Sequence, residues 1–189
     1  MPQAKTLTAK ELRRVLDSIA SNPNSARNRL MLLMTHWAGM RVGEVAALRI
    51  RDVLNDDESV KQEIRLDAAQ TKGKHARNVF VNDKLRKEIG LYVKQLGVKD
   101  DGRPLFSTQK RAAFSANTLC QAMNVIYRRA GIEGATSHSG RRSFITTLAS
   151  KGIGVRVLAA LAGHRSIATT QAYIDVNDEM KRAAVEMAA

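Results

Sequence analysis

The chain is poor in several residue types, and each shortage excludes a class of protein. Its 189 residues include one cysteine, four Phe, three Tyr and one Trp. The single cysteine, Cys120, cannot form an internal disulfide or a cysteine-based zinc cluster. The scarcity of aromatics disfavours a protein that binds single strands by stacking bases. No apolar run approaches the ~20 residues that are needed to span a membrane.

Acidic residues are also in short supply compared with basic ones. The chain has 31 Lys and Arg against 18 Asp and Glu, which gives a net charge of +13. The excess is spread along the sequence, and this favours a polyanionic partner such as nucleic acid. The first residues are polar and lead into a helical pattern, so we find no signal peptide. We therefore expect a cytoplasmic protein with no membrane partner.

The periodicity predicts one mostly helical domain over residues 1–189. Thr8 and Glu11 form a capping box before helically spaced apolar residues. Ser25 is expected to cap a second helix, and Ser166 a late helix that carries Tyr173. Further helices are predicted over residues 42–48, 84–96, 117–130, 139–151, 155–162 and 178–189.

A short stretch in the first half alternates between apolar and polar residues. Ile64 and Leu66 show this period, as do Val79 and Val81, and residues 72–74 between them form a hairpin tip. We expect a small antiparallel sheet of three short strands there. The predicted fold class is therefore mainly α with a small antiparallel sheet, α+β.

A set of basic residues that ends in a tyrosine carries the chemistry. Cations of this kind can surround a phosphate, neutralise its developing charge and give a proton to a leaving oxygen. A nearby tyrosine adds an oxygen nucleophile that can hold a phosphoryl group covalently. The residues are Arg41, Lys72, His138, Arg141, His164 and Tyr173.

The local contexts of these residues resemble those of the tyrosine recombinase (phage integrase) family. His138 and Arg141 form a His-x-x-Arg step, and His164 lies in a Leu-x-Gly-His context. Tyr173 ends a Thr-Thr-x-x-Tyr motif, and Arg41 lies in Gly-x-Arg-x-x-Glu. The resemblance covers about residues 7–176 and implies the fold of the catalytic domain of that family.

The resemblance also implies a role for each residue. Tyr173 is the expected nucleophile, and Arg41 and Arg141 are expected to hold the non-bridging oxygens of the phosphate, because guanidinium is planar and always charged. His138 and His164 would donate hydrogen bonds to the same phosphate, and His138 could assist proton transfer.

Two supporting assignments follow from spacing. Lys72 is expected to protonate the leaving 5′ oxygen, with Lys74 as its rival two residues further on. Glu44 lies three residues after Arg41, so on a helix it can turn back to orient Arg41 or His138. Two histidines without cysteine or carboxylate partners do not make a zinc signal, so we expect no metal and no other cofactor.

Four further basic residues are candidates for DNA contacts. Arg142 follows Arg141 directly, where the family more often has His, and could contact the DNA backbone. The four candidates are Lys74, Arg77, Arg142 and Arg165.

The resemblance implies a site-specific recombinase or integrase that acts on duplex DNA as a tetramer and is a monomer when free. It also implies a nucleoid-associated protein that is encoded by a bacterium, phage or plasmid. Most members carry a helical DNA-binding domain before the catalytic one, and we expect none here, because the first capping box begins at Thr8. Residues 177–189 could dock on a neighbouring protomer or pack on their own domain. The rival functions are a non-catalytic DNA-binding regulator of the same fold and a nicking enzyme of the type IB topoisomerase kind.

Overall fold

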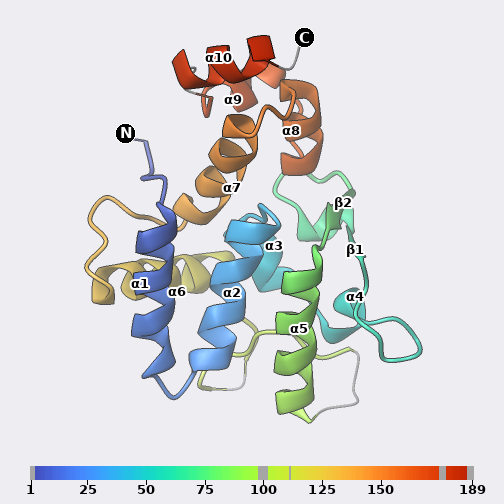
Figure 1. Ribbon diagram of the computed structural model, residues 1–189. Helices are drawn as coiled ribbons and strands as arrows, with labels where there is room; N and C mark the ends of the chain where they lie inside the picture. Colours follow the sequence, from blue (N-terminus) through green and yellow to red (C-terminus); the bar gives the residue numbers. More distant parts are fainter. Residues whose placement is uncertain (1–2, 98–101, 111, 175–177, 187–189) are drawn as a thin grey trace.

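The computed structural model describes residues 3–97, 102–110, 112–174 and 178–186. Over these residues the protein is mainly helical with one small sheet, as predicted (Figure 1). In chain order the elements are α1 (Ala9–Ala20), α2 (Ser25–Trp37), α3 (Val42–Ala47), α4 (Ile50–Val53), β1 (Glu63–Leu66), the 3-10 helix η1 (Ala68–Gln70), β2 (Arg77–Phe80), α5 (Asp83–Leu96), α6 (Ala116–Arg129), α7 (Ser139–Ser150), α8 (Val155–Ala162), α9 (Ile167–Gln171) and α10 (Asp178–Glu186).

The core is organised around α2, which is buried along most of its length. Every residue from Leu30 to His36 is buried, because α1, α5 and α7 all pack on this helix. The contact with α7 is so close that a Cβ at Gly140 would collide with Thr35 and His36. A helix pair that approaches this closely has a fixed separation, and this fixes the start of α7, where Arg141 lies.

The sheet has two antiparallel strands in the described residues, so the prediction of three strands is wrong. β1 and β2 pair with Ile64 opposite Val79 and Leu66 opposite Arg77. The segment before β1 makes only one isolated bridge, Leu54 with Val60, because a turn with positive φ at Glu58 intervenes. After β1, η1 and a turn in which Lys74 N–H donates to the Thr71 carbonyl take up the remaining chain.

Local capping signals located most helix ends correctly. The Thr8 hydroxyl accepts from Glu11 N–H, and the Glu11 carboxylate accepts from Thr8 N–H, which is the predicted capping box. Asn82 caps α5 through Leu85 N–H. Two details differ from the expectation. Asn24 rather than Ser25 is the residue before α2, and α9 ends at Gln171, so Tyr173 lies just beyond it.

The last four helices gather at one end of the molecule, with α8 beside β2 (Figure 1). The predicted helix 178–189 corresponds to α10, and its last three residues lie outside the described part. No helix of the described chain combines the length and the apolarity that crossing a membrane would require. The arrangement brings residues from both halves of the chain together where β2 meets α8.

Candidate active site

Arg41 lies at the start of α3, where the chain leaves a tight turn. Gly39 has a φ of +62°, the left-handed region that favours glycine. Arg41 follows as the N-cap residue in extended conformation, and its N–H donates to the Glu44 carboxylate at 2.8 Å. Its Nη1 donates to the other Glu44 oxygen at 3.1 Å. The half-buried side chain of Arg41 is therefore held against Glu44 from two directions.

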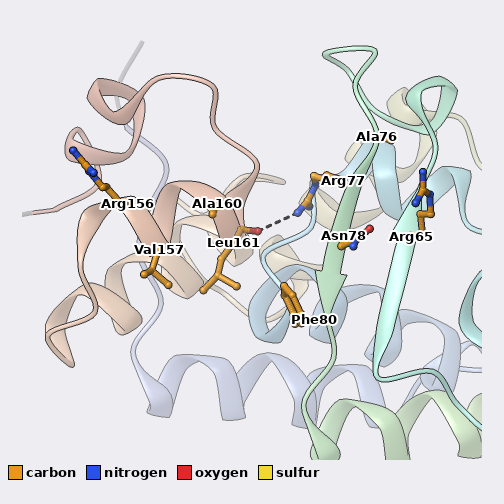
Figure 2. Close-up of a pocket in the computed structure, with 9 residues that line it drawn as sticks. All are labelled: Arg65, Ala76, Arg77, Asn78, Phe80, Arg156, Val157, Ala160 and Leu161. Carbon is orange, nitrogen blue, oxygen red and sulfur yellow. Dashed lines mark hydrogen bonds between the residues drawn. The ribbon is translucent and has the colours of Figure 1, made fainter.

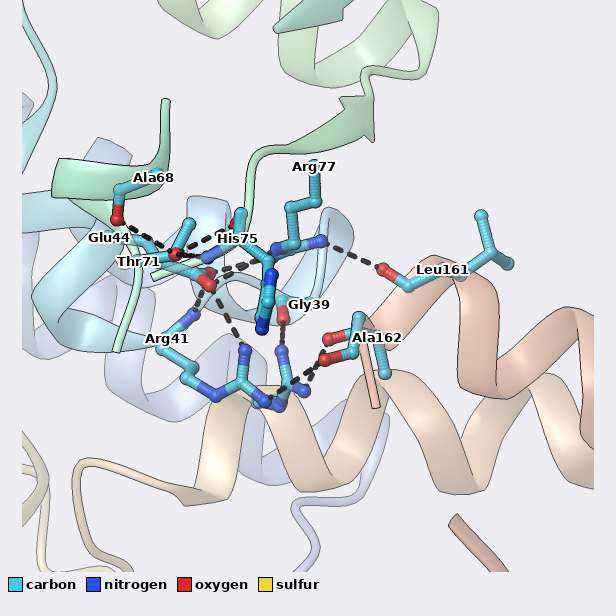
Figure 3. A network of polar contacts seen from close by, with 11 residues as sticks. Gly39, Arg41, Glu44, Ala68, Thr71, His75, Arg77, Leu161 and Ala162 are labelled. Carbon is cyan, nitrogen blue, oxygen red and sulfur yellow. Dashed lines mark hydrogen bonds and ion pairs between the residues drawn. The ribbon is translucent and has the colours of Figure 1, made fainter. Parts of the chain in front are cut away.

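Glu44 is a buried carboxylate with two arginine partners. Its side chain is 1% exposed, and Arg77 donates to both of its oxygens, from Nε at 3.1 Å and from Nη2 at 2.7 Å (Figure 3). Burial raises the pKa of Glu44, but the hydrogen bonds and charges of Arg77 and Arg41 outweigh it and lower the pKa overall. Glu44 is therefore an anion at neutral pH and is ion-paired with both arginines. No hydrogen bond or ion pair joins it to His138 within the described residues, and its role in orienting Arg41 stays a prediction.

The C-terminal end of α8 accepts hydrogen bonds from three arginines that are far apart in the sequence. Leu161 carbonyl accepts from Arg77 at 3.0 Å, and Gly163 carbonyl from Arg41 at 3.4 Å. Ala162 carbonyl accepts from Arg141. The last carbonyls of a helix lack partners within it, and the helix dipole favours cations there. The arginines are therefore assembled by the end of α8 as well as by Glu44.

Arg141 is the most buried of the candidate residues that carry a charge at neutral pH, apart from Glu44. It is 4% exposed, and besides Ala162 it donates to the Gly39 carbonyl at 2.7 Å. Burial, and then the positive charge of Arg41, lower its pKa to about 9. It still carries its charge at neutral pH. Two carbonyl partners fix the guanidinium beside Arg41 without neutralising its charge.

His164 is brought to the site by a left-handed residue that ends α8. Gly163 has a φ of +62°, and His164 N–H donates back to the Ala159 carbonyl at 2.9 Å. The ring Nδ1 lies 2.8 Å from the hydroxyl of Thr170. Burial, and then the charges of the nearby arginines Arg141, Arg41 and Arg77, lower the pKa of His164 to about 4. His164 is therefore neutral at pH 7.

Tyr173 packs between His164 and Arg142. Its ring stacks on the His164 ring with centroids 5.7 Å apart and an interplanar angle of 22°. The guanidinium of Arg142 lies 5.5 Å from the centroid of the Tyr173 ring. The side chain is half-buried, and its hydroxyl makes no hydrogen bond with any residue that the structure describes. The predicted nucleophile thus lies directly against one of the predicted phosphate ligands.

His138 and Lys72 are both exposed. His138 immediately precedes α7, and Arg141 follows three residues later, so the two share one turn of the chain. Lys72 lies in the loop between η1 and β2 and lines a cleft beside Arg41 and His164. Its rival Lys74, with a φ of +51°, does not line this cleft. This placement favours Lys72, and its role as the acid stays a prediction.

The four candidates for DNA contacts fall into two pairs. Lys74 and Arg165 are exposed. The side chain of Arg77 is only 10% exposed and is engaged by Glu44 and Leu161. Arg142 is 9% exposed, and its Nε donates to Thr6. The second pair therefore has internal partners that the sequence did not suggest, whereas DNA contact by all four stays a prediction.

Two hollows adjoin β2. The smaller one is lined by three of the six catalytic candidates, Arg41, Lys72 and His164, whereas His138, Arg141 and Tyr173 do not line it. It measures about 490 Å³ and lies between the η1–β2 loop and the turn after α8. Its lining includes Arg41, Thr71, Lys72, His75, Arg77, His164 and Arg165. The larger one, of about 720 Å³, lies between β2 and α8 and is lined by apolar side chains such as Phe80 and Val157 together with Arg65 and Arg156 (Figure 2). Arg77 lines both hollows. The smaller, cationic cleft suits a phosphate.

The phage integrase family sequence profile matches residues 5–180. The chain belongs to this family. It is 31% identical over 187 residues to the tyrosine recombinase XerA of Pyrococcus furiosus. The aligned region covers 97% of this chain and 62% of that relative. The tyrosine recombinase XerC of Caldanaerobacter subterraneus is 28% identical over 185 residues, with coverages of 95% and 49%. The chain therefore spans about half to six-tenths of the length of these relatives.

Solved structures of phage integrase family members have the same fold. The crystal structure of XerA recombinase aligns with a TM-score of 0.77 at 27% identity, covering 99% of this chain and 66% of that one. XerH, solved with its difH substrate before cleavage, aligns with a TM-score of 0.70 at 26% identity, covering 95% and 53%. The agreement in fold extends over nearly the whole chain.

Two features of this family member escaped the sequence reasoning. Arg77 was predicted only as a candidate for DNA contact, and its ion pair with Glu44 was not expected. The available signal was its place one residue before a predicted strand. Thr170 was noted only as part of the context of Tyr173. Its full burial and its contact with His164 depend on the turn at Gly163, which a linear pattern does not reveal.

Proposed function

We propose that the chain is the catalytic domain of a site-specific tyrosine recombinase, which cleaves and rejoins duplex DNA without metal or ATP. The observation that carries the proposal is the meeting of Arg41 and Arg141 at the end of α8, next to a His164 ring that stacks on Tyr173. Two fixed cations, a neutral hydrogen-bond donor and an oxygen nucleophile are the groups that phosphoryl transfer requires.

The proposed reaction has two balanced steps. The Tyr173 oxygen attacks the phosphorus, the bond to the 5′ oxygen breaks, and Lys72 gives that oxygen a proton. His138 assists the loss of the proton from the tyrosine. The free 5′ hydroxyl of a partner strand then attacks the 3′-phosphotyrosyl link and gives its proton to the deprotonated Lys72. The bond from phosphorus to the Tyr173 oxygen breaks, and the released tyrosine takes its proton back with the help of His138. The covalent link keeps the energy of the phosphodiester, so no nucleotide is consumed.

The arginines would act mainly through preorganised charge. Arg41 and Arg141 are held by Glu44 and by backbone carbonyls before any substrate arrives. Little reorganisation is then needed as charge develops on the non-bridging oxygens. Removal of one such donor from a preorganised site costs on the order of 10²–10³ in rate.

The proposed partner is duplex DNA, with two sites brought together in a tetramer. The net charge of +13 and the cationic cleft support a polyanion, and the related XerH was solved with a DNA substrate. We propose residues 1–189 as one catalytic domain, with residues 177–189 docking on a neighbouring protomer. Action on DNA places the protein in the compartment that holds the DNA.

A nicked duplex tests the proposal. DNA that flanks the gene is first screened for a sequence that the chain protects, and a nick is then placed so that the short 5′ fragment is lost after cleavage. We expect a protein–DNA adduct that resists denaturation and is absent in Tyr173→Phe. Its absence on a protected site would favour the DNA-binding regulator. Transfer of a strand between two duplexes would then distinguish recombination from the relaxation of a type IB topoisomerase.

A further inference from the structure

Thr170 lies beneath the site, and its hydroxyl contacts the inner nitrogen of His164. The residue is completely buried in α9, and its Oγ1 lies 2.8 Å from His164 Nδ1. The ring of His164 lines the cleft, while Thr170 does not. The histidine thus has one nitrogen facing the protein interior and one available to a ligand.

Hydrogen-bond accounting fixes the direction of this bond. A threonine hydroxyl carries one proton that needs an acceptor when it is buried. The only hydrogen-bond partner of the Thr170 hydroxyl among the described residues is His164 Nδ1. If Nδ1 carried a proton, the hydroxyl proton would be buried without an acceptor, at a cost of about 1–3 kcal/mol. Thr170 therefore donates, and Nδ1 accepts.

A neutral imidazole whose Nδ1 accepts must carry its proton on Nε2. The lowered pKa of His164 agrees with a neutral ring. Thr170 also contacts the segment of the nucleophile, because its carbonyl accepts from Tyr173 N–H at 2.9 Å. Thr170 is thus hydrogen-bonded to both His164 and Tyr173.

We propose that Thr170 is a positioning residue for phosphoryl transfer: its hydroxyl holds His164 as the Nε2–H tautomer, so that a proton donor rather than a lone pair meets the phosphate oxygen. The inference rests on the proposed function for its rate effect, but not for the tautomer itself. The outer hydrogen bond that orients a metal-bound histidine is commonly worth about 10- to 100-fold, and we expect an effect of the same order for His164.

Three single variants distinguish the effect of losing the Thr170 hydroxyl from an effect on folding. Thr170→Val keeps the shape and removes the donor, and we expect adduct formation to slow by about 10- to 100-fold with DNA affinity unchanged. Thr170→Ser keeps the hydroxyl and should restore most of the rate. Thr169→Val is the matched control, because Thr169 is the preceding, exposed residue, and it should react like the wild type. A slow Thr170→Ser, or a fast Thr170→Val, would overturn the proposal.

A double variant tests whether the effect passes through His164. If it does, Thr170→Val should cause no further loss in a His164→Ala background. The same loss in both backgrounds would mean that Thr170 acts on Tyr173 or on folding instead, and the proposal would be wrong.

The tautomer of His164 can be measured directly, without an assay of DNA cleavage. Nitrogen NMR of imidazole-labelled protein distinguishes the two nitrogens, and the chain has only four histidines to assign by substitution. We expect the proton of His164 on Nε2 in the wild type and a tautomer mixture in Thr170→Val. A wild-type ring protonated on Nδ1 would refute the proposal, even if the variants fold poorly. Absence of a DNA adduct with the expected tautomer would instead count against the recombinase function alone.

Discussion

Arg77 donates to both carboxylate oxygens of Glu44, at 3.1 and 2.7 Å, although 33 residues separate the two in the chain. The carboxylate is 1% exposed and the guanidinium side chain 10% exposed, so the pair is shielded from water. A shielded pair contributes little net stability, but removing one partner leaves a buried charge unpaired. This asymmetry makes Glu44 a sensitive position.

Glu44→Gln should therefore destabilise the protein by about 3–5 kcal/mol, because both Arg77 and Arg41 lose their anionic partner. Denaturant unfolding measures the change. Asp83→Asn is the matched control: it breaks the ion pair between Asp83, whose side chain is 90% exposed, and Arg86. A surface pair of this kind is worth about 0–1 kcal/mol. Equal losses in the two variants would contradict the buried network.

Gly163→Ala should reduce both stability and adduct formation. The left-handed conformation costs an alanine about 1–2 kcal/mol, and the new Cβ would lie 2.6 Å from Arg77 Cδ, an atom held in place by Glu44. Gly97→Ala is the control, because its φ is +61° and no atom lies within 4 Å of the added Cβ. We expect the two variants to share the conformational loss, and only Gly163→Ala to cleave DNA slowly. Similar cleavage rates would mean that the packing against Arg77 does not matter.

Stability should fall with pH below neutrality, partly through His36. Burial lowers its pKa from 6.5 to about 4 in the folded state. When the pH falls below 6.5, His36 takes up a proton in the unfolded state but stays neutral in the folded state. The stability that is present above pH 6.5 is therefore lost progressively down to about pH 4. At about 1.4 kcal/mol for each pH unit between the two pKa values, the loss approaches about 3 kcal/mol.

Unfolding measured from pH 7.5 to 4.5 checks this. His36→Gln should flatten the curve relative to the wild type, whereas His75→Gln, on the exposed loop, should leave its slope unchanged. A wild-type slope in His36→Gln would show that other groups cause the acid sensitivity.

DNA affinity should depend steeply on salt and on the exposed cations of the cleft. Lys72→Ala and Arg165→Ala should each lower the slope of log affinity against log salt by about 1, since each neutralises roughly one phosphate. Lys10→Ala, on the exposed face of α1, should leave it unchanged. Titrations between 50 and 200 mM salt provide the measurement. A nearly constant affinity over this range would contradict binding through the DNA backbone.

Local signals predicted the helices well, because a cap depends on neighbours in the sequence. Thr8 and Ser166 each immediately precede the helix that they were predicted to begin. The third strand was wrong, because pairing across the turn at Glu58 stops after one bridge, and no periodicity reports that. The short helix α4 was missed for a related reason: four residues are too few to show a period.

For the candidate site too, the sequence predicted one part and not another. Spacing and context indicated which residues could take part, and the structure brings Arg41, Glu44, Arg141, His164 and Tyr173 together. The hydrogen-bond partners of these residues could not be predicted from the sequence, because they are backbone carbonyls or residues of distant segments. Arg77 is the clearest example: its basic side chain suggested contact with DNA, and only the burial of Glu44 explains its position.

The hydrogen bonds at the end of α8 also bear on when the site forms during synthesis. Arg41 and Arg77 find carbonyl partners 122 and 84 residues later in the chain. A growing polypeptide that has not yet extended past Gly163 therefore holds these arginines without those partners, and it also lacks His164 and Tyr173. The order of translation therefore delays the assembly of Arg41 and Arg77 with His164 and Tyr173 until the chain has been synthesised beyond Tyr173.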